Sequence, residues 1–155
     1  MSIRWMTDTE ALAFLAGQSE GRLATCGASG EPYITPLNFL YRDGNIYFHS
    51  KLDGRKLENI AENSRVCFEV SSVDKLMVSV DRACGCSTRY SSVLAFGDAQ
   101  ILNDTAEKAA LLNLLVKRYA DGKPCQPVKE EDAAGCAVVE IRIRKLSGKR
   151  NVDPQ

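Results

Sequence analysis

Asn45–Asn63 reads NIYFHSKLDGRKLENIAEN and is the stretch that decides the fold. It opens with a β-type run, Ile46–Phe48, that ends at His49, the only histidine of the chain. A polar turn containing a glycine follows, and Arg55 and Lys56 then open a segment of helical character. The stretch therefore predicts a strand, a tight turn and a helix in close succession.

This strand-to-helix junction gathers groups that suit a phosphate. Ser50 offers a hydroxyl, and the start of the helix offers unpaired backbone N–H groups. Lys51, Arg55 and Lys56 add positive charge. The positive end of the helix dipole strengthens the attraction for an anion. An ordinary solvated turn accounts for the same residues equally well on local grounds.

The composition excludes several classes of protein. The 155 residues suffice for one domain with a hydrophobic core. The 20 Lys and Arg residues balance the 20 Asp and Glu residues, so nothing favours general nucleic-acid binding. No apolar run reaches the roughly 20 residues of a membrane span, and no signal-peptide core opens the chain. We therefore expect a cytoplasmic protein that binds neither nucleic acid nor membrane.

The six cysteines need a reason other than disulfide bonds in such a compartment. Three fall in β-type runs and are expected to be small core residues, namely Cys26, Cys67 and Cys136. Cys84 and Cys86 form a CGC sequence in a loop, and Cys125 lies in another loop. A CxC without a second pair is a weak metal signal, so we predict no metal site. The reactivity of these thiols stays open.

Capping and alternation patterns predict the remaining elements. Helices are expected at about 7–18, 54–63 and 105–122. Strands are expected at about 22–26, 32–41, 45–50, 65–71, 75–80, 89–102 and 136–146. Turn signals such as Asp43-Gly44 join the first three strands into an antiparallel meander. The polar tail 147–155 is expected to be partly frayed.

Strands in hairpin order with few helices favour a mainly β, α+β fold, an antiparallel barrel with peripheral helices. We expect a single domain over residues 1–155 with its core at about 6–146. No GxGxxG motif follows a strand and no Walker motif occurs, which excludes Rossmann and P-loop folds. Pro36 cannot donate to a sheet ladder, so it marks an edge strand or a bulge.

His49 is the only candidate base for hydrolytic chemistry, and no GxSxG surrounds any serine. A lone histidine at the end of a strand is most often a structural residue. Contact with a ligand ring, axial ligation of haem and proton transfer near neutral pH are the alternatives.

Two further segments carry weaker signals. Arg89–Val93 places an arginine and two hydroxyls at a strand start, where they either contact a phosphate or face solvent. Ile34–Phe39 contains the proline, and free backbone groups beside a bulge could contact a flat heteroaromatic ligand.

Six motifs occur in a fixed order along the chain: GRLAT (21–25), PYITPLNF (32–39), DGNIYFHS (43–50), GRKLENI (54–60), NSRVCFEV (63–70) and YSSVLAFGDA (90–99). Together they resemble the pyridoxamine 5′-phosphate oxidase-like, FMN-binding split-barrel superfamily. Within it the chain is most similar to the nitroimidazole-resistance (Nim) branch. The resemblance covers about residues 6–145.

The resemblance implies a split antiparallel β-barrel that forms a homodimer, with FMN sites at the subunit interface. Arg55 and Lys56 match the basic pair that holds the FMN phosphate, beside His49, Ser50 and Lys51. The other implied FMN contacts are Pro36, Leu37, Asn38 and Phe39 at the isoalloxazine ring, Arg22, Leu23, Ala24 and Thr25 toward the ribityl–phosphate side, and Tyr90, Ser91, Ser92 and Val93.

The resemblance also implies an FMN-dependent oxidoreductase. It would pass electrons from a nicotinamide or protein donor to a small acceptor such as a nitroaromatic, with His49 as the candidate catalytic residue. Gly54 stands where true oxidases have a serine, and residues 145–155 lack their arginine- and histidine-bearing substrate motif, so oxidation of B6 vitamers is not expected. The alternatives are a haem-binding split-barrel protein with His49 as an axial ligand, and a non-catalytic flavin-binding module.

Overall fold

The computed structural model describes residues 2–79 and 85–152. Its strands are β1 (Ser2–Trp5), β2 (Glu20–Cys26), β3 (Pro32–Asn38), β4 (Leu40–Arg42), β5 (Asn45–Ser50), β6 (Arg65–Met77), β7 (Ser87–Ile101) and β8 (Ala137–Val152). Its helices are α1 (Asp8–Gly17), α2 (Arg55–Glu62), α3 (Thr105–Tyr119) and α4 (Glu130–Ala134). The strands form one antiparallel sheet in the order β3-β2-β6-β7-β8-β5-β4, with β1 also paired to β8.

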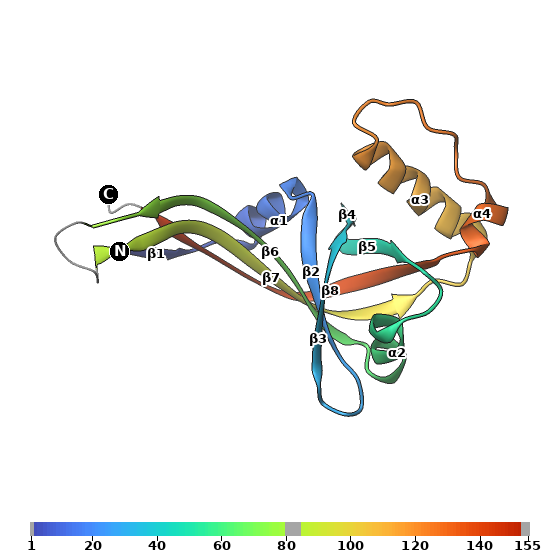
Figure 1. Cartoon of the computed structure of the whole chain (residues 1–155), viewed down its shortest axis with the longest axis horizontal. Coiled ribbons are helices and arrows are strands. Elements are labelled where there is room, and N and C mark those ends of the chain that lie inside the picture. Colours follow the sequence, from blue (N-terminus) through green and yellow to red (C-terminus); the bar gives the residue numbers. More distant parts are fainter. Residues whose placement is uncertain (1, 80–84, 153–155) are drawn as a thin grey trace.

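The sheet closes on itself because its two end strands are consecutive in the chain. β3 lies at one end of the strand order and β4 at the other, and only Phe39 separates them. The sheet must therefore curl until its ends meet at Phe39, which makes it a split antiparallel barrel with helices around it (Figure 1). The predicted fold class is confirmed.

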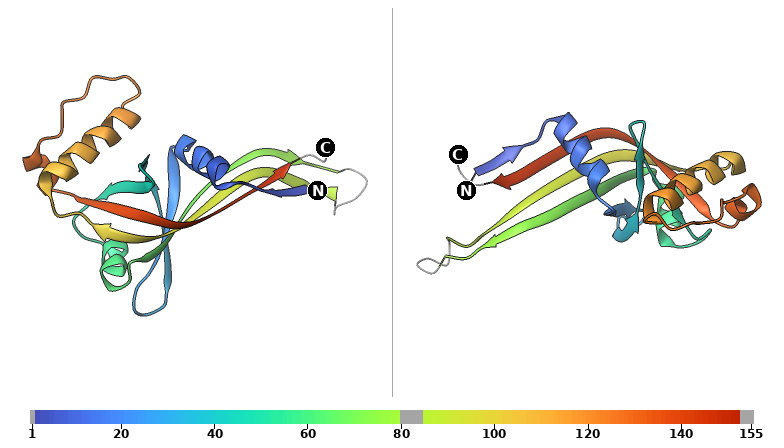
Figure 2. Two further views of the ribbon diagram at one scale, coloured as in Figure 1. Left: turned by 180° about the vertical axis from the view of Figure 1, so that it is seen from behind. Right: turned by 90° about the horizontal axis from the view of Figure 1, so that it is seen from above.

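Half of the sheet extends beyond the barrel. β6, β7 and β8 run on together into a long twisted arm with β1 at its edge, on the side away from α3 (Figures 1 and 2). The two ends of the described chain lie beside each other on this arm. The molecule thus has a compact end with α2, α3 and α4, and an open end made of strands.

The main core fills the barrel. Phe39, Phe48 and Phe68 are fully buried, and the rings of Phe39 and Phe68 pack edge to face with centroids 4.8 Å apart. A second apolar cluster, which includes Tyr47 and Leu112, lies outside the barrel and joins β5 and β8 to α3 and α4. β5 therefore contributes to both clusters, from its two faces.

The predicted caps are present. Thr7 and Glu10 form a capping box at α1, and Asp104 caps α3 by accepting a 2.7 Å hydrogen bond from the Glu107 N–H. Pro36 lies on β3, an end strand of the sheet, as its missing N–H predicts.

Several predicted boundaries are wrong. The strands expected at 65–71 and 75–80 form one strand, β6, whose register shifts between Val73 and Lys75. The tail is not frayed at residues 147–152, because β8 continues there between β7 and β1. The strand predicted at 32–41 is divided at Phe39 into β3 and β4. The two predicted hairpins are therefore present, as the pairs β2–β3 and β4–β5, but they lie at opposite ends of the strand order rather than in one continuous meander. β1 and α4 were not predicted.

The cysteines differ in burial from the prediction. Cys26, Cys67 and Cys136 are half-buried free thiols rather than core residues, while Cys86 and Cys125 are exposed. Cys84 lies outside the described residues. No described helix is long and apolar enough to cross a membrane.

Candidate functional site

Helix α2 is held against β2 by side-chain hydrogen bonds. Asn59 Nδ2 donates to Thr25 Oγ1 (3.0 Å), and Asn63 Nδ2 donates to the Cys26 carbonyl (2.9 Å). Glu62 accepts a 2.7 Å bond from the Ala28 N–H. These contacts hold the second half of α2 against the end of β2 and the turn that follows it.

The segment Ser50–Lys56, which we call the cationic turn, carries the predicted basic pair. The Arg55 guanidinium lies 4.9 Å from the centroid of the Tyr33 ring and pairs with the Glu31 carboxylate at 3.2 Å. Lys56 is half-buried and has no ion-pair partner among the described residues. Gly54, with φ of +118°, precedes the helix and supplies no side chain to cap its N–H groups.

Ser50 is the unusual member of the cationic turn. Its side chain is only 8 % exposed, and its Oγ finds no hydrogen-bond partner among the described residues. The Oγ1 of Thr35 on β3 is buried and unpartnered in the same sense. A buried hydroxyl without a partner is costly, so these two atoms mark places where a bound molecule would supply the missing bond.

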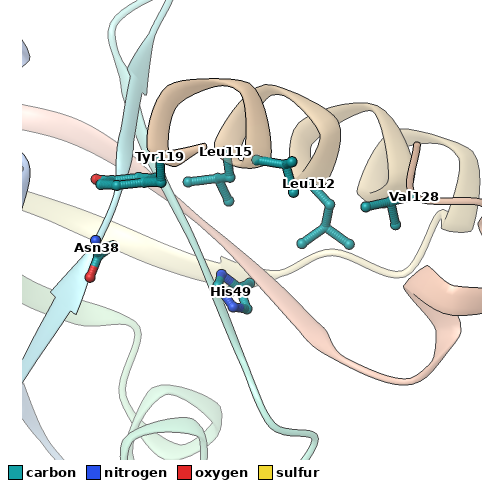
Figure 3. Close-up of a pocket in the computed structure, with 7 residues that line it drawn as sticks. Asn38, His49, Leu112, Leu115, Tyr119 and Val128 are labelled. Atoms are coloured by element: carbon teal, nitrogen blue, oxygen red, sulfur yellow. The ribbon is translucent and has the colours of Figure 1, made fainter. Parts of the chain in front are cut away.

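A second site, which we call the α3 cleft, lies on the other side of β5. It has a volume of about 440 Å³ and is lined by Asn38, His49, Leu112, Leu115, Val116, Tyr119 and Val128. Figure 3 shows Leu112 and Leu115 on α3 facing His49 on β5, with Asn38 at the side of the cleft. Two predicted cofactor contacts from separate motifs, Asn38 and His49, therefore meet here.

Hydrogen bonds hold α3 in place over this cleft. The Tyr119 hydroxyl accepts a 2.9 Å bond from the Phe39 N–H and lies 2.7 Å from the Phe39 carbonyl and 2.6 Å from the Ser19 carbonyl. Arg118 Nη2 donates to the Ala16 and Gln18 carbonyls at 2.9 and 2.6 Å. Tyr119 of α3 thus supplies hydrogen bonds to the backbone of Phe39, the residue between β3 and β4. We call this set of contacts the Tyr119 clamp.

A buried carboxylate secures β5 beside the cleft. Glu140 accepts hydrogen bonds from the Tyr47 hydroxyl (3.0 Å), from Asn45 Nδ2 (3.1 Å) and from Gln100 Nε2 (2.6 Å). Burial, and to a lesser extent the Glu140 carboxylate, raise the pKa of Tyr47 above its ordinary value. Tyr47 therefore stays protonated as a donor, and the network acts as a structural support.

A third cleft lies on the outer face of the sheet. It measures about 420 Å³ and is lined by Arg22, Ala24, Ile34, Cys67, Glu69, Ser71 and Leu94. Arg22 pairs with Glu69 across the strands at 3.2 Å. Burial raises the pKa of the Cys67 thiol, with a further contribution from Glu69, so this thiol is not an activated nucleophile.

Because side chains alternate along a strand, predicted FMN contacts that are neighbours in the sequence lie on opposite faces of the sheet. Leu23 and Val93 are in the barrel core, and Thr25 and Ser91 are also buried. Their neighbours, Arg22 and Ala24 on β2 and Tyr90 and Ser92 on β7, stand on the opposite face of the sheet. On β3 and at its end, Leu37 and Phe39 turn to the core while Pro36 and Asn38 turn outward. Four consecutive side chains cannot all reach one ligand.

The α3 side of the site cannot be predicted from the sequence. The helical spacing of Leu112, Leu115 and Tyr119 is the same whether they face a core or a cleft. Thr35 lies within the PYITPLNF motif, where no local pattern distinguishes its hydroxyl as a ligand contact.

Comparison with known proteins agrees with the split-barrel fold. The family model described as pyridoxamine 5′-phosphate oxidase matches residues 7–150. A 5a,11a-dehydrotetracycline/5a,11a-dehydrooxytetracycline reductase of Streptomyces rimosus is 41 % identical over 66 residues, which cover 40 % of this chain and 46 % of the reductase. The match thus spans less than half of that relative.

Two solved structures share the fold over almost the whole chain. One is described as a 5-nitroimidazole antibiotic resistance protein from Bacteroides thetaiotaomicron, with a TM-score of 0.79 and 22 % identity, covering 97 % of this chain and 89 % of that one. The other is a FAD- and haem-binding protein from Mycobacterium smegmatis, with a TM-score of 0.84 and 18 % identity, covering 99 % and 75 %.

Proposed function

This chain belongs to the pyridoxamine 5′-phosphate oxidase family, and from that premise we propose that it is an FMN-binding oxidoreductase. The observation that carries the proposal is the buried hydroxyl of Ser50, which has no hydrogen-bond partner among the described residues and lies in the same turn as the basic pair Arg55 and Lys56. A phosphate ester is a ligand that this combination suits.

The cationic turn fits the phosphate of FMN. A phosphate oxygen would accept the missing hydrogen bond from Ser50 Oγ and from N–H groups at the start of α2. Lys56 has no competing ion-pair partner among the described residues, and Arg55 would exchange its exposed pairing with Glu31 for the phosphate. Lys51, exposed in the same turn, adds positive charge.

The flavin ring would then lie toward Asn38 and His49. Pro36 and Asn38 face outward from β3 and would contact the ring, whereas Leu37 and Phe39 turn to the core and would support that segment by packing. Arg22 and Ala24 with Tyr90 and Ser92 stand on the outer face and would contact the cofactor by side chain. Leu23, Thr25, Ser91 and Val93 are buried and would act through backbone groups or by packing.

When bound, the flavin would supply the electron and hydride chemistry, and the protein would bind and orient it and limit access of water. We propose a nicotinamide or protein donor and a small acceptor, in the class of nitroaromatics. The reductase from Streptomyces rimosus and the nitroimidazole resistance protein support this choice.

We also propose that the chain forms a homodimer through the strand arm. Val73 and Leu76 on β6 are 68 % and 69 % exposed, and Val78, directly after β6, is 80 % exposed. Trp5 on β1 is 66 % exposed. Exposed apolar side chains gathered on one arm favour burial against a partner. Light scattering after size-exclusion chromatography should give the mass of two chains, and a Leu76→Glu variant should give the mass of one.

The test of the proposed function is direct. The purified protein should take up one FMN per chain with a flavin absorbance spectrum, and should oxidise NADH or NADPH with an added acceptor. A protein that stays colourless after incubation with FMN would refute flavin binding. Stoichiometric FMN without turnover, across donors and acceptors, would instead favour a non-catalytic flavin-binding module.

Haem is a second candidate because His49 projects into an apolar cleft and the protein from Mycobacterium smegmatis binds haem as well as FAD. The expected signature is a Soret band that His49→Ala abolishes. Flavin absorbance without haem uptake would exclude this candidate.

A further inference from the structure

We propose that the α3 cleft binds an uncharged aromatic molecule, which serves as the electron acceptor. This inference rests on the proposed function, because it takes the flavin ring to lie at the Asn38 and His49 side of the cleft. It adds the place where the acceptor binds, the α3 cleft, and the requirement that the acceptor carry no charge.

The residues that line the cleft disfavour a charged ligand. Leu112, Leu115 and Val116 on α3 provide an apolar wall, and Val128 continues it. No carboxylate, lysine or arginine is among the described residues that line the cleft. An anionic acceptor entering here would give up its hydration without a cation to replace it, which costs free energy. An uncharged ring would instead bury apolar surface against the leucines.

Few polar groups remain to contact a ligand. The Tyr119 hydroxyl is already occupied by Phe39 and Ser19, and this leaves the amide of Asn38 and the imidazole of His49. Both come from the strand side of the cleft, opposite the leucines (Figure 3). The acceptor should therefore be flat, with an apolar body and a polar edge turned toward the strands.

The cleft is formed before any ligand binds. Asn113 grips the backbone of Val128 with two hydrogen bonds, donating to its carbonyl at 2.9 Å and accepting from its N–H at 2.8 Å. The Tyr119 clamp holds the other end of the wall. A volume of about 440 Å³ lies within the usual range of roughly 300–1,000 Å³ for small-molecule sites.

Two probes of equal size distinguish the charge of the ligand. We would measure binding of uncharged 2-naphthalenemethanol and anionic 2-naphthoate by calorimetry, to the FMN-loaded and to the flavin-free protein. The uncharged probe should bind at least about tenfold more tightly to both forms, given the cost of desolvating an unpaired charge.

Two variants locate the binding. Val128→Trp should fill the cleft and weaken the uncharged probe by at least about tenfold, as overpacking excludes a ligand. Val116→Lys, at a half-exposed position of the same wall, should reduce or reverse the preference for the uncharged probe. Ile101→Trp is the matched control, because Ile101 is 37 % exposed and outside the cleft. Circular dichroism checks folding, and if Val128→Trp does not fold, Val116→Lys decides.

The outcomes separate the two proposals. Equal binding of both probes, or affinities unchanged in both variants, would overturn the inference while FMN uptake could still hold. Loss of FMN from folded Val128→Trp would place the flavin in the cleft and also overturn it. A charge preference that depends on Val116 in a protein that takes no FMN would support the cleft as an aromatic site and refute the flavin function.

Discussion

The cationic turn and the α3 cleft lie on opposite sides of β5. The turn carries positive charge, whereas the cleft is lined mainly by apolar side chains. His49 faces the cleft with its leucines, while Ser50, the next residue, is buried on the core side and leads into Arg55 and Lys56. The peptide bond between residues 49 and 50 thus separates the uncharged cleft from the proposed phosphate site. Alternation along β5 lets a single strand end present two kinds of ligand contact without mixing them.

The largest expected effect comes from removing the charge of the cationic turn. Arg55→Ala with Lys56→Ala should weaken FMN by about 100-fold, since each charge-assisted hydrogen bond is worth about 1.5–3 kcal/mol. Riboflavin, which lacks the phosphate, should bind as before. Fluorescence titration with both flavins measures this. Arg42→Ala is the control, because Arg42 is also an exposed arginine in an ion pair, with Asp43. An equal loss of affinity for riboflavin would show that the cationic turn does not act on the phosphate, and would contradict the contrast between the two regions.

The next effect concerns the α3 side. Tyr119→Phe should leave the buried Phe39 N–H without its 2.9 Å partner and lower the free energy of unfolding by about 1–3 kcal/mol. Urea denaturation measures this, with Tyr41→Phe as the comparison. The FMN to riboflavin affinity ratio should not change, because the clamp is separate from the cationic turn. A changed ratio would show that the two regions are coupled.

The third prediction concerns Ser50→Ala, whose effects on stability and on FMN binding should differ. In the flavin-free protein it should leave stability unchanged or raise it by up to about 1 kcal/mol, because it removes a buried hydroxyl that has no partner among the described residues. The affinity for FMN should nonetheless fall by roughly tenfold. His49→Ala, one residue away, should not alter the FMN to riboflavin ratio. Thermal unfolding and flavin titration of both variants decide the matter, and a destabilised Ser50→Ala would contradict the assignment.

The smallest expected effect concerns the ion pair of Arg4 and Glu10, which belongs to neither region. A hydrogen bond from Arg4, with others from Thr7, lowers the pKa of Glu10 from 4.5 to about 2. Because the folded pKa is lowered, the stabilisation is fully present above pH 4.5 and is lost as the pH falls toward about 2. The Glu10→Gln variant should thus unfold at a slightly lower temperature than the wild type at pH 7, and at about the same temperature as the wild type at pH 2. A difference that persists at pH 2 would mean that packing matters more than charge.

The sequence predicted the regular parts of this molecule well. Alternation in β6 and the caps at Thr7 and Asp104 are local signals, and the structure follows them. The cationic turn was visible for the same reason, since its groups are neighbours in the chain. Its role as an FMN site stays a prediction.

The rest depended on contacts between distant segments. Whether Leu112 and Leu115 face a core or a cleft is decided by where α3 packs, and the Tyr119 clamp at Phe39 joins residues 80 positions apart. β8 continues through residues 147–152 because β1 and β7 pair with it on both sides, although the tail itself is polar. Pairing partners of this kind leave no local pattern.

The closure at Phe39 also sets an order of events during synthesis. β5 pairs with the first half of β8, so the hairpin of β4 and β5 has no second neighbour until residues 137–142 have been made. Until then the outer edge of this hairpin stays open. Barrel closure is therefore a long-range step that a ribosome-bound chain completes only after β8 has been made. Chains stalled before β8 should be the species of this protein most prone to aggregate.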